Sequence, residues 1–181
     1  GVSDRVVDLI GDNVDCVVRG GGINDQSLIA RHVGDLQIGV YVAPSYVERL
    51  GAPAHPRELE NTDHRIVGFL SSRTGKIDPL VLNGESERIE ITGSYVLAVD
   101  DGNAYLEAGL AGLGVIALPV YMAAAHQACG SLIPLFENWR IDPMPLYLAF
   151  PPNRHVNVKL RVFIDWIVEL MQQHVPTSTH K

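Results

Sequence analysis

The fold of this chain is decided by residues 94–119, whose sequence is SYVLAVDDGNAYLEAGLAGLGVIALP. The run Tyr95–Val99 is apolar and rich in branched side chains, which predicts a buried β-strand. Turn-forming and capping residues follow at Asp100–Asn103, and Ala104–Ala111 is rich in helix formers. A second buried strand, Val115–Leu118, ends at a proline, which cannot donate to a strand ladder. A strand, a helix and a strand joined by tight loops predict a βαβ unit with parallel strands.

The carboxyl edge of this unit is the first candidate for a ligand site. In parallel α/β units, ligands bind in the crevice at the carboxyl ends of the strands, which here is the turn Asp100–Asn103. The first turn of a helix presents free N–H groups and a partial positive charge, and both favour an anion. One alternative stays open, which is that Asp101 or Asn103 simply caps the helix.

Length and composition narrow the class of protein. The chain has 181 residues, enough for one sizeable core or for two small lobes. Its net charge is −7 and it contains no Lys/Arg run, so this segment itself is not expected to bind nucleic acid. Its apolar stretches are too short to cross a membrane, and its first residues do not resemble a signal peptide. Two lone cysteines, Cys16 and Cys129, predict reduced, packed thiols in a cytoplasmic protein.

On both sides of the βαβ unit, short strands and helices follow one another. Further strands are expected at 14–18, 28–33, 36–42, 64–70, 132–136 and 145–150, a two-strand ribbon at 79–83 and 88–91, and helices at 2–10, 44–50, 57–60, 120–129 and after Asn157. In the last helix, one apolar stripe is expected to pack into the core: Leu160, Phe163, Ile164, Ile167, Leu170 and Met171.

Two stretches could connect two lobes. Ile38–Ala43 would lead out of the first lobe, and Tyr147–Phe150 would lead back into it. A chain that leaves a lobe and returns in this way forms a double crossover hinge. A ligand held between two such α/β lobes can bias their closure.

The sequence contains no established catalytic motif. It has no Gly-x-Ser-x-Gly elbow, no His-Glu-x-x-His pair and no P-loop. Gly112–Ala117 fits a loose dinucleotide fingerprint, but it follows a helix and leads into a strand, which is the reverse of the required context. His55 and His64 are more typical of surface residues than of a zinc site, and no base lies near Asp100-Asp101. We therefore expect no enzyme activity, no cofactor and no metal.

Arg19 is the most informative charged residue. It ends a predicted strand and precedes three glycines, so its guanidinium group could form a bidentate pair with a carboxylate ligand. A solvated or salt-bridged arginine is the open alternative. Ser71, Ser72 and Thr74 could offer hydroxyl groups to a ligand, or they could be ordinary turn residues.

Several segments together resemble the C-terminal effector-binding domain of LysR-type transcriptional regulators. Val14–Gly20 resembles the family's strand that ends in D-x-x-x-R, and Val40–Tyr46 resembles its hinge-and-helix segment. Gly109–Pro119 is similar to the family's glycine-rich motif that ends in Leu-Pro. The remaining matches, which follow in order and spacing, are Leu132–Leu135, Pro145–Pro151, Arg154-His155 and Lys159–Trp166.

The resemblance implies a type 2 periplasmic-binding-protein fold, in which two Rossmann-like α/β lobes are joined by a double crossover hinge. Lobe I would contain residues 1–43 plus 147–181, and lobe II residues 44–146. The family's effector domain begins with one further strand and helix, so lobe I would be truncated at its N-terminus. The DNA-binding helix-turn-helix domain of the family would also be absent from this chain.

The resemblance also implies partners and a site. The chain would bind a small-molecule effector in the cleft between the lobes and would form homodimers or tetramers. Arg19 and the start of the helix after Asp101, not the resemblance, lead us to expect an anionic effector. It would contact DNA only through the absent N-terminal domain, and it would not contact a membrane. The effector-binding residues would be Ser3, Arg19, Gly20, Leu70, Ser71, Ser72, Asp100, Asp101 and Asn103.

Two rival interpretations stay open. A solute-binding protein of a transport system would share the fold and would carry an export signal or a lipid anchor. An enzyme on a two-lobed α/β scaffold would need titratable groups clustered in the cleft, for example a histidine beside Asp100 or Asp101.

Overall fold

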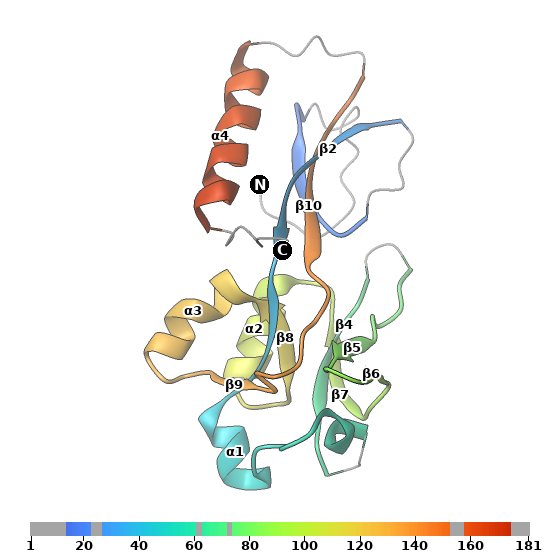
Figure 1. Cartoon of the computed structure of the whole chain (residues 1–181), viewed down its shortest axis with the longest axis vertical. Coiled ribbons are helices and arrows are strands. Elements are labelled where there is room, and N and C mark those ends of the chain that lie inside the picture. The colour runs from blue at the N-terminus through green and yellow to red at the C-terminus, as the bar shows by residue number, and fades with distance from the viewer. Residues whose placement is uncertain (1–13, 23–26, 61–62, 72–73, 153–157, 175–181) are drawn as a thin grey trace. The chain divides into compact units, whose positions relative to one another are not determined.

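The computed structural model of this chain (Figure 1) describes residues 14–22, 27–60, 63–71, 74–152 and 158–174. The chain forms two compact units. Unit 1 contains Ile38–Asp142, and unit 2 contains the described residues before Ile38 and after Asp142. The chain thus leaves one unit after Gln37 and re-enters it at Pro143. The helix expected at residues 2–10 lies outside the described residues.

Unit 1 is built from short strands and helices whose ends lie within a few residues of the predicted ones. Its strands are β3 (Ile38–Val42), β4 (Ile66–Phe69), β5 (Leu80–Asn83), β6 (Arg88–Ile91), β7 (Tyr95–Val99), β8 (Ile116–Pro119) and β9 (Ile133–Leu135). Its helices are α1 (Pro44–Leu50), the 3-10 helix η1 (Pro56–Glu60), α2 (Gly102–Leu110) and α3 (Val120–Ala128).

The strands of unit 1 confirm the predicted βαβ unit. β4 pairs in parallel with β7 on one side, and Ile66 forms a parallel bridge with Val115, the residue just before β8, on the other. β7 and β8 therefore run in the same direction, with β4 between them and α2 as their connection. β3 pairs antiparallel with both β8 and β9, so the stretch Ile38–Ala43 belongs to the sheet of unit 1 and does not simply lead towards it.

Two glycines after α2 explain how the helix is joined so tightly to β8. Gly112 has φ of +70°, a conformation that residues other than glycine rarely adopt, and it follows directly after the C-cap of α2. A Cβ atom on Gly114 would lie 2.9 Å from the carbonyl oxygen of Arg65 and 3.0 Å from the amide nitrogen of Val67. Glycine at 114 therefore allows the chain entering β8 to approach the backbone of β4.

Successive residues of β3, β4 and β8 point to opposite faces of the sheet, and each face has its own core. Tyr41, Val67 and Ile116 pack with residues of α2 and α3. Val40, Ile66 and Val115 pack on the other face, together with buried residues of α1, η1 and the β5–β6 ribbon, which are Tyr46, Leu59, Leu82, Ile89 and Ile91. Burying a side chain of this size contributes about 1.5–3 kcal/mol, so both layers stabilise the sheet.

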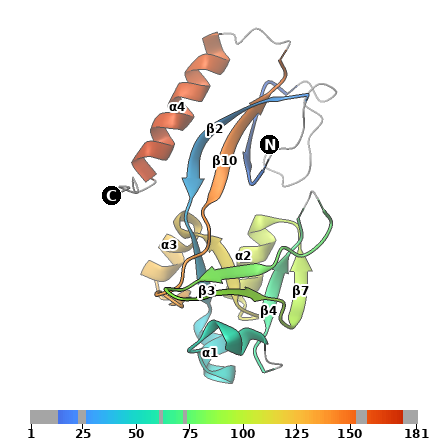
Figure 2. The ribbon, with the colours of Figure 1, turned by 45° about the vertical axis from the view of Figure 1, so that its right-hand side comes forward.

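Unit 2 contains the strands β1 (Val17–Gly20), β2 (Ile29–Leu36) and β10 (Met144–Phe150), and the helix α4 (Val158–His174). β10 lies between β1 and β2 and is antiparallel to both. The prediction of a strand at residues 14–18 is partly wrong, because pairing with β10 extends through Gly20 and starts only at Val17. Figures 1 and 2 show α4 lying along β2 and β10.

One side of α4 supplies the core of unit 2. Leu160 and Ile164 are buried against Val33, Leu148 and Phe150, and Ile167 and Met171 extend this contact, as predicted for these four residues. Phe163 departs from the prediction, since 36% of it is exposed. Neither α4 nor any other helix in the described part of the chain is long and apolar enough to cross a membrane.

The two cysteines are free thiols in different surroundings. Cys16 is half-buried, and burial raises the pKa of its thiol. Cys129 is exposed at the end of α3, so the prediction of a packed thiol is wrong for this residue. Hydrogen bonding by Ser131, whose Oγ lies 3.2 Å from Sγ, lowers the pKa of the Cys129 thiol.

Candidate functional site

In unit 1, two of the loops predicted to bind a ligand begin at the same edge of the sheet. The parallel register pairs Phe69 of β4 with Val99 of β7, so both strands end at the same level. The amide of Leu70 then donates a hydrogen bond of 2.7 Å to the carbonyl oxygen of Val99. The structure thereby brings Leu70 and Ser71 next to the turn that contains Asp100, Asp101 and Asn103. Ser72 lies outside the described residues.

Asp101 acts as the N-cap of α2. One of its carboxylate oxygens accepts hydrogen bonds from the amides of Asn103, at 3.0 Å, and Ala104, at 2.9 Å. A negative charge at this end of a helix is favourable by about 0.3–1 kcal/mol. The structure therefore shows Asp101 as a helix cap, which was the alternative left open by the sequence. The N–H groups of Asn103 and Ala104 are already hydrogen-bonded and are not available to a ligand at this edge.

Backbone hydrogen bonds link Ser71 to residues 75 and 76 of the loop after β4. The amide of Ser71 donates to the carbonyl oxygen of Lys76 at 2.9 Å, and the amide of Gly75 donates back to that of Ser71 at 2.8 Å. Ser71 is half-buried, whereas Lys76 is exposed. Among the described residues of this loop, Ser71 and Thr74 carry hydroxyl groups and Lys76 carries an ammonium group. Oγ1 of Thr74 accepts a hydrogen bond of 3.2 Å from the amide of Lys76, which is the contact of a turn residue.

In unit 2, Arg19 belongs to a row of polar side chains that crosses the sheet. It is half-buried and pairs with Tyr147, which in turn pairs with His32. The rings of Tyr147 and His32 are in edge contact at 5.4 Å, and Nε2 of His32 lies 2.9 Å from Oδ1 of Asp35. Neighbouring residues of a strand alternate in direction, so this row faces away from buried Leu148 and from α4.

The sequence did not single out Tyr147 and His32. Alternation along β10 and β2 could have assigned each of them to a face, but the register that aligns them with Arg19 depends on pairing between distant segments.

Gly20, the last residue of β1, is exposed, and Gly21 follows in a turn with φ of +81°. Ser3 lies outside the described residues.

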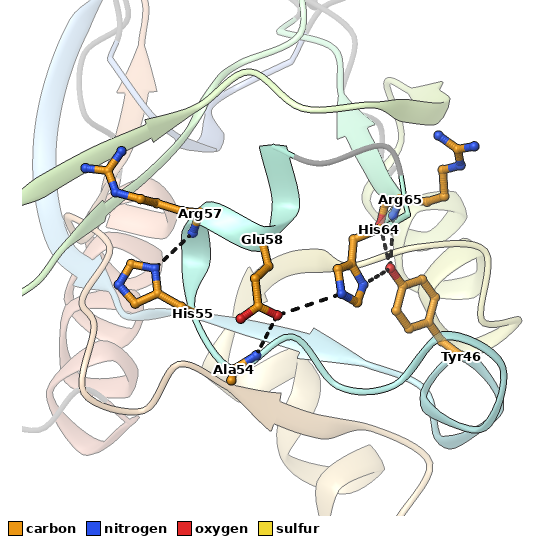
Figure 3. Close-up of polar contacts among 7 residues, drawn as sticks. All are labelled: Tyr46, Ala54, His55, Arg57, Glu58, His64 and Arg65. Atoms are coloured by element: carbon orange, nitrogen blue, oxygen red, sulfur yellow. Dashed lines mark hydrogen bonds and ion pairs between the residues drawn. The ribbon is translucent and has the colours of Figure 1, made fainter.

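Unit 1 also contains a polar cluster that sequence reasoning missed, centred on Tyr46 (Figure 3). The hydroxyl oxygen of Tyr46 accepts a hydrogen bond of 2.9 Å from the amide of Arg65 and shares one of 3.0 Å with Nδ1 of His64. On its other side, Nε2 of His64 lies 4.0 Å from a carboxylate oxygen of Glu58, which accepts a hydrogen bond from the amide of Ala54. The cluster links α1, η1 and the segment before β4.

The surroundings of this cluster indicate a structural role. The side chain of Tyr46 has no exposed surface, and 11% of the His64 side chain is exposed. Burial raises the pKa of Tyr46, partly offset by its hydrogen bond to the backbone of Arg65 and by the charges of Arg49 and Arg65. Buried polar groups need partners, and here each partner comes from the same unit.

Each histidine with a described polar contact interacts with a partner other than Asp100 or Asp101. Nδ1 of His55 accepts a hydrogen bond from the amide of Arg57, and its ring packs edge-on against Trp139 at 5.2 Å. His64 contacts Tyr46 and Glu58, as described above. Among the described residues, no three His, Cys, Asp or Glu side chains are grouped so that they could hold a metal ion.

A groove of about 430 Å³ lies elsewhere on unit 1. It is lined by Pro53, Ala54 and residues 133–139, which include Glu137 and Trp139. None of the site residues predicted from the sequence lines it.

Known proteins match this chain over nearly its whole length. The family model of the LysR substrate binding domain matches residues 1–172. An HTH-type transcriptional repressor of Pseudomonas aeruginosa (strain UCBPP-PA14) is 30% identical over 172 residues, which are 95% of this chain and 54% of the repressor. The chain thus spans about half the length of the curated relatives it matches.

Solved structures of regulatory domains agree with this family assignment. The regulatory domain of CrgA, a LysR-type transcriptional regulator from Neisseria meningitidis, is 26% identical with a TM-score of 0.75, and the match covers 90% of this chain and 78% of that one. The regulatory domain of AphB from Vibrio vulnificus is 25% identical with a TM-score of 0.67, covering 88% and 76%. These relatives are transcriptional regulators and not transport proteins, and their fold is the type 2 periplasmic-binding-protein fold. The chain therefore belongs to the LysR substrate-binding domain family, the effector-binding regulatory part of LysR-type transcriptional regulators.

Proposed function

We propose that this chain is the sensor of a DNA-binding transcriptional regulator and that it binds a small anionic molecule. The match of the family model to residues 1–172 carries this proposal. The anionic character of the ligand rests on Arg19, whose guanidinium group suits a carboxylate, and on Lys76 beside the loop after β4. The proposed effector-binding residues are Ser3, Arg19, Gly20, Leu70, Ser71, Ser72, Asp100, Asp101 and Asn103.

The proposed mechanism is a population shift. A ligand that binds one conformation of the chain more tightly than another moves the equilibrium towards the first, by as much as the difference in affinity allows. The DNA-binding part of the regulator, through which the protein would contact DNA, responds to that shift in conformation. In this role the chain catalyses no reaction, and it works in the cytoplasm, where the DNA is.

We also propose that the chain forms a homo-oligomer through the edge of β7. Within the described residues, β7 pairs on one side only, with β4. Val96 and Leu97 of β7 are 49% and 39% exposed. An uncharged strand edge with exposed apolar side chains is a favourable place for a second chain to pair.

Calorimetric titration of the intact regulator with a set of small carboxylates, phosphates and neutral analogues tests the proposed ligand class. We expect a carboxylate or phosphate among the binders, and at least a tenfold weaker affinity in the variant Arg19→Met, since a charge-assisted pair contributes about 1.5–3 kcal/mol. The matched control is Arg31→Met, because Arg31 is exposed on the opposite face of the same sheet. Binding of neutral compounds alone would contradict an anionic effector.

A further inference from the structure

The helix α4 has a second apolar row on the side that does not pack against the sheet. Val158, Val162 and Trp166 follow one another at intervals of four residues and are 79%, 61% and 52% exposed. The ring of Phe163 lies 5.8 Å from that of Trp166 and widens the row. Figure 2 shows β2 and β10 along one side of α4, and the buried residues Leu160 and Ile164 account for that side. Large apolar side chains grouped on a surface in this way mark an interaction site.

A row of charged side chains lies beside the apolar row, and its positive and negative charges are at opposite ends. Arg161, Asp165 and Glu169 also follow at intervals of four, and all three are exposed. Within the described residues, they make no ion pair with another side chain of the chain. The positive charge therefore lies towards the start of α4, and the negative charges lie towards its end.

We propose that α4 of one copy docks against α4 of a second copy, with the two helices antiparallel. In an antiparallel pair related by a two-fold axis, each charged row faces its own counterpart in reverse order. Arg161 of each copy then lies opposite Asp165 or Glu169 of the other, whereas a parallel pair would place like charges together. The apolar rows meet in the middle, where Val162 and Trp166 lose their contact with water.

The length of the helix suits such a contact. α4 has 17 residues, which is roughly 25 Å at 1.5 Å per residue. Two antiparallel helices can therefore align both the apolar row and the charged row over about three turns. This surface is separate from the edge of β7, so a chain that uses both faces has two self-complementary contacts, which is what a tetramer requires.

Charge reversal gives a test that does not depend on the ligand. The variant Arg161→Glu makes the whole charged row acidic, and the double variant Asp165→Arg with Glu169→Arg makes it basic. We expect each variant alone to lose one association step in sedimentation analysis, so that the mass of its oligomer halves. An equal mixture of the two variants should recover the mass of the unmodified protein, because the acidic row of one then faces the basic row of the other.

A second measurement follows the apolar row directly. In the variant Trp139→Phe, Trp166 is the remaining tryptophan, and we expect its fluorescence to shift to shorter wavelength as protein concentration rises. Circular dichroism shows whether the variants keep their fold. Three results would overturn the proposal: an unchanged mass in both charge variants, a mixture that fails to recover the lost step, or Trp166 emission that does not depend on concentration.

Discussion

At the scale of single residues, the hydroxyl group of Tyr46 joins α1 to the segment before β4. It bonds to the ring of His64 and to the backbone of Arg65, although these residues are 18 and 19 positions away in the sequence, respectively. Sequence patterns could predict that α1 has a buried face, but they could not predict this contact, because nothing local to Tyr46 specifies its partners. The polar group is held in an otherwise apolar core, so its loss should be costly.

The variant Tyr46→Phe removes this hydroxyl group and keeps the ring. We expect the free energy of unfolding to fall by about 1–3 kcal/mol, because the amide of Arg65 is left without its partner. Urea denaturation followed by circular dichroism measures the change. Tyr41→Phe is the matched control, since Tyr41 is also buried but its hydroxyl group makes no hydrogen bond within the described residues. Equal losses in the two variants would show that the hydrogen bonds of Tyr46 contribute nothing.

Asp101 gives a second prediction at this scale. Replacing it with alanine removes the cap of α2, and we expect a loss of about 0.5–2 kcal/mol in the free energy of unfolding. Replacing it with asparagine keeps an acceptor for the amides of Asn103 and Ala104, so the loss should be smaller. Thermal unfolding of the two variants side by side distinguishes the outcomes. If Asp101→Asn is as unstable as Asp101→Ala, the carboxylate acts through its charge and not as a cap.

At the scale of elements, the glycine-rich link between α2 and β8 sets the spacing of the sheet. The sequence predicts that these glycines end the helix, and Gly112 does so. The role of Gly114 could not be predicted, because the backbone it approaches belongs to β4, far away in the sequence. The same is true of Arg19, whose neighbours Tyr147 and His32 become visible only when β1, β10 and β2 are in register.

The variant Gly114→Ala tests the close approach. Its methyl group would meet backbone atoms of Arg65 and Val67, which cannot turn away as a side chain can, so we expect a loss of about 1–3 kcal/mol in the free energy of unfolding. Gly22→Ala serves as the control, because a methyl group on Gly22 would have no atom within 4 Å of it. A change below about 0.5 kcal/mol in Gly114→Ala would contradict the tight packing of β8 against β4.

The contact between α2 and β8 also predicts a pH dependence. The buried hydroxyl group of Tyr105 accepts a hydrogen bond of 3.1 Å from the amide of Ala117, and burial raises the pKa of Tyr105 to about 12. The folded state therefore keeps this proton at a pH where the unfolded state, with a pKa of about 10, has lost it. Stability should be fully present below pH 10 and should fall as the pH rises from 10 to 12, by about 1.4 kcal/mol per pH unit from this group.

Urea denaturation between pH 9 and pH 11 measures this slope. In Tyr105→Phe we expect a lower stability at pH 9 and a shallower decline towards pH 11 than in the unmodified protein. Tyr121→Phe, at an exposed position in α3, should leave the slope unchanged. A decline in Tyr105→Phe as steep as in the unmodified protein would mean that Tyr105 does not titrate with unfolding in this range.

At the scale of the whole molecule, most of the architecture could be predicted from the sequence. Strand and helix signals are local, so the βαβ unit, the β5–β6 ribbon and the buried stripe of α4 all follow from short patterns. Patterns of this kind do not show whether a side chain at the end of a helix or strand is buried or exposed. For that reason the prediction of a packed thiol at Cys129 was wrong.

The position of a bound ligand can be mapped directly by following the backbone amide signals of the chain in two-dimensional NMR. With a carboxylate that binds the intact regulator, we predict that the signals of Arg19 and Gly20 in unit 2 and those of Leu70, Ser71 and Asn103 in unit 1 shift together, with one dissociation constant. Shifts confined to the groove lined by Pro53 and Trp139, or to one of the two sets of residues, would contradict the proposed sensor site.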